Sequence, residues 1–289
     1  MKKVYAYIDG LTTTPAVIDW AAWSARRLGV PLELLHVLER DPDAAAVSDF
    51  SGAIGLGAQE ELLSQLSELD AQRGRLSQQA GRQMLDRAQE RARSAGVEQV
   101  AALMRQGELV DTVLEMEPDA RLVVLGEHHR PGKTGMLHLD HHVERVVRAA
   151  KCPVLVATKE DFAEPAHFAI ADDGSTTAIK MVAAVARSPM LAGLPCSVVR
   201  CGTDDGEARR SLDEAQQVLQ AAGFEVNVAM LRGDAHEAIP DWLASQGTSL
   251  LVMGAYGHSR IRHLVVGSTT TTLLRVSPCG LLPVSMTPC

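Results

Sequence analysis

The chain has 289 residues and a formal net charge of −8; 46% of its residues are hydrophobic and 22% are charged. This is ordinary globular composition, and the length suggests two domains. The acidic balance and the aromatic content of only 3% argue against nucleic acid as a partner, because such binders usually carry a basic stripe or stacking platforms. No run of about 18 uncharged apolar residues occurs, so we expect no membrane span.

The first residues, Met1 to Asp9, reach an acidic residue too soon for the apolar region of a signal peptide. We therefore interpret them as a strand and expect a cytoplasmic protein. The chain contains 5 cysteines, an odd number, and no Cys-x-x-Cys pair. This pattern favours neither a disulfide framework nor a thiolate zinc site.

The two halves of the chain resemble each other. Each half opens with a short apolar strand that ends in Asp-Gly, carries a glycine after a later strand, and then has a strongly apolar strand that ends in glycine. The corresponding residues are Asp9-Gly10 and Asp173-Gly174, Gly107 and Gly233, and Gly126 and Gly254. We expect one domain over residues 1–159 and a second over 166–289, with a charged, proline-containing link between them.

Within each half, apolar strands alternate with amphipathic stretches such as residues 15–28 and 207–222. The runs 122–125 and 250–253 are apolar throughout, as expected for strands that are covered on both faces. Alternation of strands and helices implies right-handed crossovers and a parallel sheet. The predicted fold class is α/β, with a doubly wound sheet of about five strands in each half.

The first half contains an additional segment, residues 41–73, after its second predicted strand. It begins with a glycine-rich stretch, and Leu62, Leu63, Leu66 and Leu69 then follow at helical spacing. We interpret it as a flexible loop that leads into an added helix. A lid over a ligand and a dimer contact are the alternatives.

The second half carries the pattern Gly254-x2-Gly257-x9-Gly267-Ser268 after a buried strand. Glycines let the backbone approach a ligand closely, and free N–H groups at a helix N-terminus favour an anion. Ser268 and Thr269 can donate hydrogen bonds to phosphate oxygens, and His258 and Arg260 can add positive charge. The alternative is a strand that ends in glycine, followed by a serine N-cap, with no ligand.

This pattern resembles the nucleotide-binding signature of the universal stress protein family, and the landmarks in both halves agree with a tandem member. The resemblance implies a site for ATP or a related adenine nucleotide, with Mg²⁺ as a candidate companion ion. Asp173 would bond the ribose hydroxyls, and the backbone at Val198 and Val199 would border adenine. The implied site residues are Asp173, Gly174, Ser175, Val198, Val199, Arg232, Gly233, Met253, Gly254, Gly257, His258, Arg260, Gly267, Ser268 and Thr269.

The resemblance also implies that the halves pair as a pseudo-twofold dimer through their last strands, near Val154 and Leu282. Dimerisation of the whole chain is a further hypothesis, and the added helix near Leu62 to Leu69 is a candidate contact.

The first half has lost the signature. His129 takes the place of the second glycine, Asp140 falls where phosphate would lie, and Leu11 replaces the serine after Asp-Gly. We expect no phosphate binding here, although binding of a small adenosine-like ligand is an open alternative. His128, His129, His138, His141 and His142 crowd together in the same region. Metal binding is one interpretation of this cluster, and solvated loop histidines are the interpretation we favour.

These features predict a stress-response protein that binds adenine nucleotide in its second half and uses occupancy as a regulatory signal. No nucleophile and base pair is recognisable among Ser175, Ser268 and Asp173, so any ATPase activity should be weak. A nucleotide-independent interaction scaffold is the alternative from another functional class.

Overall fold

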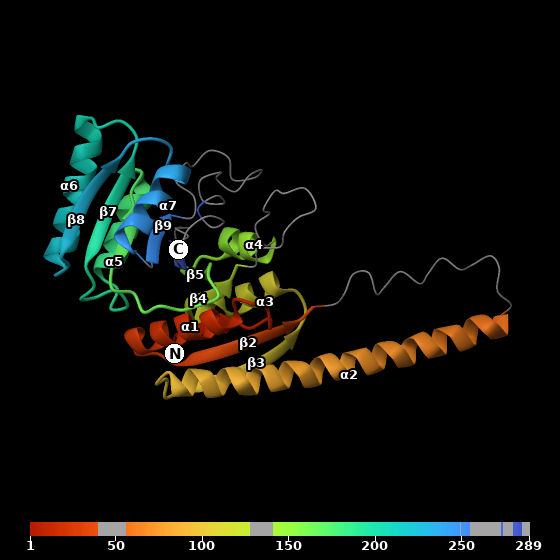
Figure 1. The fold of residues 1–289 in the computed structure, drawn as a ribbon. Helices are drawn as coiled ribbons and strands as arrows, with labels where there is room; N and C mark the ends of the chain where they lie inside the picture. Colours follow the sequence, from red (N-terminus) through yellow and green to blue (C-terminus); the bar gives the residue numbers. More distant parts are fainter. Residues whose placement is uncertain (40–55, 128–140, 249, 255–272, 274–279, 285–289) are drawn as a thin grey trace.

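The computed structural model describes residues 1–39, 56–127, 141–248, 250–254, 273 and 280–284 (Figure 1). Its first half alternates strands and helices as predicted. The elements are β1 (Lys3–Tyr7), α1 (Thr14–Leu28), β2 (Leu32–Leu38), α2 (Leu56–Ser94), β3 (Val100–Gln106), α3 (Leu109–Met116), the short 3-10 helix η2 (Glu117–Asp119), β4 (Ala120–Gly126), α4 (His141–Ala149) and β5 (Val154–Ala157).

The second half repeats this alternation. Its elements are β6 (Phe168–Ala171), α5 (Thr176–Ala186), β7 (Cys196–Cys201), α6 (Gly206–Ala221), β8 (Val226–Leu231), α7 (Ala235–Gln246), β9 (Leu250–Gly254) and β10 (Gly280–Val284). Helix boundaries follow local chemistry. Pro15 stands in the first turn of α1, where a missing N–H costs nothing, and Gly29 ends that helix with a φ of 63°. The Asp205 carboxylate caps α6 by accepting from two backbone N–H groups.

The described strands form one ten-stranded sheet in the order β3-β2-β1-β4-β5-β10-β9-β6-β7-β8. Each half therefore has the doubly wound order that the sequence predicts, with its first strand in the middle. The strands within each half pair in parallel. The two halves meet where β5 pairs antiparallel with β10, with Val156 opposite Leu281. The strand order is symmetric about this junction, which confirms a pseudo-twofold pair joined through the last strands.

Helices cover both faces of the sheet. Residues of α1, α2, α5 and α6 share one apolar cluster that runs through both halves, whereas residues of α3, α4 and α7 belong to a cluster on the other face. Successive residues of β4 alternate between the clusters, and Val123 and Val124 are 3% and 0% exposed. Strands buried on both faces explain why these segments are apolar throughout rather than alternating.

Contacts outside the sheet also join the halves. The Phe162 ring, in the segment between β5 and β6, packs edge-on against Trp20 of α1 with 4.9 Å between centroids. Arg27 of α1 donates from Nε to the Met190 carbonyl oxygen at 2.9 Å and from Nη2 to the Ala192 carbonyl oxygen. The halves are therefore packed against each other rather than held only by a linker.

The additional segment of the first half differs from the expectation. Its leucine-rich part is not a separate helix, because it continues without a break into the crossover helix, giving the 39 residues of α2. No proline interrupts this stretch, and its Ala, Leu, Gln, Glu and Arg residues favour helix. At about 1.5 Å per residue the helix spans about 58 Å, far more than the strands it crosses. Figure 1 shows the start of α2 extending away from the rest of the molecule.

Within the described ranges, no helix combines the length and apolar character that crossing a membrane requires.

Candidate functional site

A tight turn follows β6 at the carboxyl end of the sheet in the second half. The backbone N–H of Asp172 still bonds the Val199 carbonyl oxygen at 2.8 Å, so the strand pairing ends there. Asp173 Oδ1 then accepts from the Ser175 backbone N–H at 3.0 Å, and Gly174 takes a φ of 72°. Ser175 caps α5 by accepting from the Ala178 N–H at 3.2 Å. The turn thus fixes an exposed carboxylate beside a helix N-terminus.

The first half contains the same turn. Asp9 Oδ1 accepts from the Leu11 N–H at 2.9 Å, and Gly10 has a φ of 80°. The Asp9 carboxylate also accepts from the Thr14 hydroxyl at 2.8 Å. The sequence repeat is therefore a repeat of hydrogen bonds, and the main difference within the turn is Leu11 in place of Ser175.

A buried ion pair lies beside the turn of the second half, and sequence reasoning missed it. Arg200 Nη1 lies 3.4 Å from Asp172 Oδ2, and that oxygen also accepts from the Ser211 hydroxyl at 2.8 Å. The Asp172 and Arg200 side chains are 2% and 17% exposed. A Cβ on Gly174 would displace the Arg200 guanidinium, so the positive φ and the ion pair both favour glycine at this position. The ion pair supports the turn that carries Asp173.

The equivalent positions of the first half hold a different pair. Strand register aligns Ile8 with Asp172 and His36 with Arg200. Ile8 is fully buried, and His36 Nδ1 lies 2.7 Å from the Ile8 carbonyl oxygen. An acidic residue where the repeat otherwise has a buried isoleucine was the signal in the sequence that could have revealed the ion pair.

Gly254 ends β9, the strand next to β6. A Cβ at Gly254 would lie 3.2 Å from the Thr177 methyl group in the first turn of α5. The structure thus brings Gly254 close to the helix that Ser175 caps. Gly126 is its counterpart at the end of β4, and a Cβ there would collide with the hydroxyl of Thr13, which is 3% exposed. Gly126 therefore has a packing reason that is independent of any ligand.

The other predicted residues occupy several settings. Val198 and Val199 are fully buried inside β7, and the carboxyl end of that strand is formed by Arg200 and Cys201. Burial raises the pKa of the Cys201 thiol, and the negative charge of Asp234 raises it further. Arg232 and Gly233 are exposed after β8, and Met253 is buried in β9. Gly257, His258, Arg260, Gly267, Ser268 and Thr269 lie outside the described residues.

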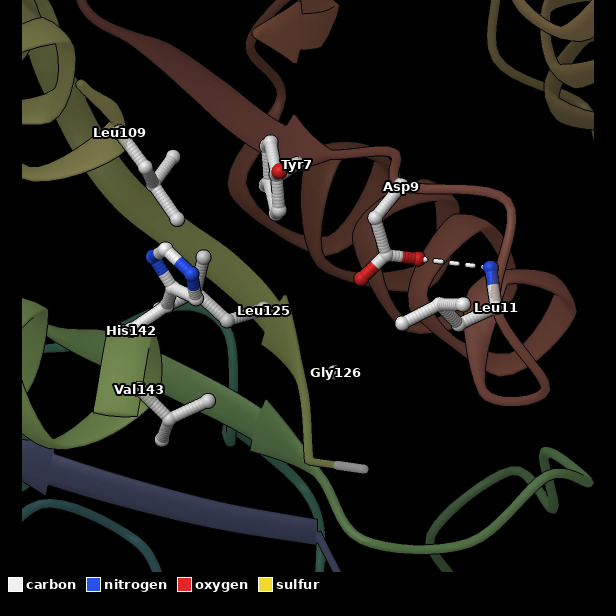
Figure 2. Close-up of a pocket in the computed structure, with 8 residues that line it drawn as sticks. All are labelled: Tyr7, Asp9, Leu11, Leu109, Leu125, Gly126, His142 and Val143. Carbon is white, nitrogen blue, oxygen red and sulfur yellow. Dashed lines mark hydrogen bonds between the residues drawn. The ribbon is translucent and has the colours of Figure 1, made fainter. Parts of the chain in front are cut away.

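The first half contains a cavity of about 160 Å³ at the carboxyl ends of β1 and β4 (Figure 2). A dry cavity of about 150 Å³ holds one benzene-sized ring, whereas drug-sized ligands occupy about 300 Å³ or more. The part of the wall that the structure describes therefore encloses space for a single small ring. The lining residues are Tyr7, Asp9, Leu11, Leu109, Leu125, Gly126, His142 and Val143.

Glu39 connects two walls of this cavity. Its Oε1 accepts from the Leu109 N–H at 3.0 Å, at the start of α3, and its Oε2 lies 3.5 Å from His142 Nε2 on α4. A carboxylate of the chain itself thus occupies a helix N-terminus in the first half. In the described part of the chain, no three potential metal-ligating side chains come together. His128, His129 and His138 lie outside it, as does the side chain of His141.

The sheet order and the repeated Asp-Gly turn define a tandem α/β protein in which both halves are doubly wound. The model of the universal stress protein family matches residues 1–158 and 182–285. The chain belongs to the universal stress protein family, as the resemblance in its sequence indicated.

Known relatives match this chain over almost its full length. Universal stress protein Slr1230 of Synechocystis is 36% identical over 285 residues, which cover 98% of this chain and 99% of the relative. A universal stress protein structure from Archaeoglobus fulgidus matches with a TM-score of 0.69 at 16% identity, covering 98% of this chain and 96% of that one. A universal stress protein structure from Pseudomonas aeruginosa matches with a TM-score of 0.63 at 15% identity, covering 99% and 93%. These structures support the fold.

Proposed function

We propose that this protein binds ATP or a related adenine nucleotide in its second half, residues 166–289, and that occupancy of the site serves as a cytoplasmic stress signal. The main support for the proposal is the turn formed by Asp173, Gly174 and Ser175. The ion pair between Arg200 and Asp172 stabilises this turn. This turn lies next to Gly254, where the glycine pattern of the second half begins.

Each group has a physical role in the proposed site. The exposed carboxylate of Asp173 is suited to accept hydrogen bonds from the ribose hydroxyls. The strand end at Gly254, with Gly257, Gly267 and Ser268 further along the chain, offers backbone N–H groups to the phosphates. Arg232, His258 and Arg260 supply positive charge, and Mg²⁺ bound with the nucleotide would neutralise part of the phosphate charge. No side chain is assigned as a nucleophile or general base, so we expect nucleotide binding without rapid hydrolysis.

The first half, residues 1–159, has a different role in this proposal. Leu11 replaces the capping serine, and the Glu39 carboxylate already occupies the N-terminus of α3. A phosphate group near that carboxylate would meet like charge rather than free N–H groups. The first half therefore completes the pseudo-twofold pair and binds no triphosphate.

Mass spectrometry of ligand released from freshly purified protein tests this proposal, followed by titration of the stripped protein with ATP, with and without Mg²⁺. We expect an adenine nucleotide and one ATP site per chain. A second ATP site of equal affinity would contradict the asymmetry between the halves. Absence of both copurified nucleotide and measurable ATP binding would instead support the interaction scaffold. Single-turnover incubation with ATP then separates a binding protein from a weak ATPase.

A further inference from the structure

Helix α2 has two parts with different surroundings. From Gly81 onwards it packs on the sheet, where Leu85, Ala88 and Ala92 are 5%, 2% and 0% exposed. At Gly81 itself, an added Cβ would lie 2.8 Å from the His36 ring. The preceding part, residues 56–80, is called the arm here. Leu69 and Leu76 on the arm are 50% and 65% exposed, among the most exposed large apolar residues of the described chain.

The leucines of the arm form one stripe. Leu62, Leu66, Leu69 and Leu76 recur at intervals of four, three and seven residues, and Arg73 and Ala80 occupy the remaining positions of the same seam. This is the spacing of a two-stranded coiled coil. The other faces of the arm carry Ser, Gln, Glu, Asp and Arg. Leu69 and Leu76 are half-exposed or more, so covering the stripe would remove apolar side chains from water and stabilise the arm.

The distribution of charge along α2 indicates that a second copy of the same helix could cover the leucine stripe. The start of the helix contains Glu60, Glu61, Glu68 and Asp70 and no basic residue. The rest of the arm, residues 71–80, contains Arg73 and Arg75 and no acidic residue. Antiparallel alignment of two such helices places acidic against basic segments, whereas parallel alignment places like charges together. The internal contact between Asp70 and Arg73 is long, 4.0 Å, and exposed, so it competes weakly.

We propose that two copies of this chain dimerise by antiparallel pairing of their arms along the leucine stripe. Antiparallel overlap also places the two sheets at opposite ends of the paired helices, so that they do not collide. Strands β5 and β10 already pair with each other inside one chain and are therefore not the edges at which a second copy joins. This inference is independent of nucleotide binding.

The oligomeric state of the full chain tests the proposal. We expect sedimentation velocity over a series from about 1 to about 100 µM to show a monomer–dimer equilibrium. The double variant Leu69→Lys/Leu76→Lys should weaken dimerisation by about tenfold or more. A matched double variant, Ser67→Lys/Ala71→Lys, adds the same charge on the opposite face of the arm and should keep the dimer. Circular dichroism and thermal unfolding establish that both variants are folded.

A charge exchange tests the orientation. Arg73→Glu/Arg75→Glu and Glu68→Lys/Asp70→Lys should each weaken self-association, because each variant removes opposite-charge contacts between the facing arms and adds like-charge ones. An equimolar mixture of the two should restore a dimer. A chain that is monomeric throughout the series would overturn the proposal. A dimer unaffected by Leu69→Lys/Leu76→Lys would place the interface elsewhere and would also overturn it.

Discussion

Arg200 Nη1 lies 3.4 Å from the buried Asp172 Oδ2, directly beside the turn that carries Asp173 and Ser175. The guanidinium also fills the space next to Gly174 in which a side chain would otherwise fit. The first half has Ile8 and His36 at these positions. One half of the repeat therefore supports its Asp-Gly turn by an ion pair, and the other by a buried isoleucine and a histidine hydrogen bond.

Removal of the arginine should destabilise the protein. Arg200→Met leaves the Asp172 carboxylate buried without its cation, and we expect a loss of about 3 kcal/mol in the free energy of unfolding. Asp172→Asn/Arg200→Met should cost less than the sum of the single changes, because the pair acts together. Arg187→Met, at an exposed arginine of the same half, is the control. Urea unfolding measures these three variants and Asp172→Asn alone, and strictly additive losses would show that the pair contributes no coupling.

The two equivalent strand-end glycines should respond differently to a methyl group. Gly126→Ala forces a Cβ onto the buried Thr13 hydroxyl, and we expect overpacking to cost about 1–3 kcal/mol. Among the described residues, Gly254→Ala meets the Thr177 methyl group at 3.2 Å, a milder contact, so its cost should be smaller. Thr13→Ala should recover part of the stability lost in Gly126→Ala. Thermal unfolding of the three variants decides the point, and equal losses at both glycines would refute this explanation of Gly126.

Stability should fall in mild acid because of His167. Its ring nitrogens lie 2.9 Å from the Thr248 hydroxyl and 3.0 Å from the Ser197 hydroxyl, and burial lowers its pKa from the ordinary 6.5. Between the lowered pKa and about 6.5 the unfolded chain binds the proton more readily than the folded one, so stability decreases as pH falls through this range. His167→Gln should flatten this part of the pH profile. The same change at the exposed His236 should not, and an unchanged slope in His167→Gln would contradict the assignment.

The proposed phosphate segment gives a prediction from sequence alone. In Gly267→Val a branched side chain occupies the place where backbone N–H groups should approach the phosphates, so ATP binding should be lost. The change lies in a predicted surface segment, and the unfolding temperature should stay close to that of the parent. Calorimetric titration and thermal unfolding test the two parts. ATP affinity equal to that of the parent would remove Gly267 from the site.

The repeat made most of the fold predictable from sequence. Asp-Gly turns, apolar strands and glycine strand ends recur in the same order, and they anticipate two matching α/β halves. The contact near Val154 and Leu282 was implied by the family resemblance, and β5 pairs with β10 there. The continuity of α2 was missed because the leucine stripe gives way to a largely polar stretch that contains Gly74 and Gly81, and glycine disfavours helix. The ion pair was missed because residues 28 positions apart form it, and no local pattern links them.

The packing of Gly126 was hidden for a related reason. Two kinds of strand-end glycine look identical in sequence: one that lets a ligand approach, and one that accommodates a threonine just before a neighbouring helix. Only the position of Thr13 against the end of β4 distinguishes them. The bridge from Glu39 to Leu109 and His142 likewise joins three elements that no spacing rule connects.

Titration with ATP of two matched variants, Asp173→Ala and Asp9→Ala, tests the central claim most directly. Both remove a carboxylate that holds the same turn, through hydrogen bonds of 3.0 Å and 2.9 Å, and Asp9→Ala removes the Thr14 hydrogen bond as well, so it is the harsher structural control. We expect Asp173→Ala to weaken ATP binding by about 1–3 kcal/mol, roughly 5-fold to 150-fold, because charged hydrogen bonds to ribose are lost. Asp9→Ala should leave the affinity unchanged. A loss of ATP binding in Asp9→Ala with full binding in Asp173→Ala would place the nucleotide in the other half and contradict this account.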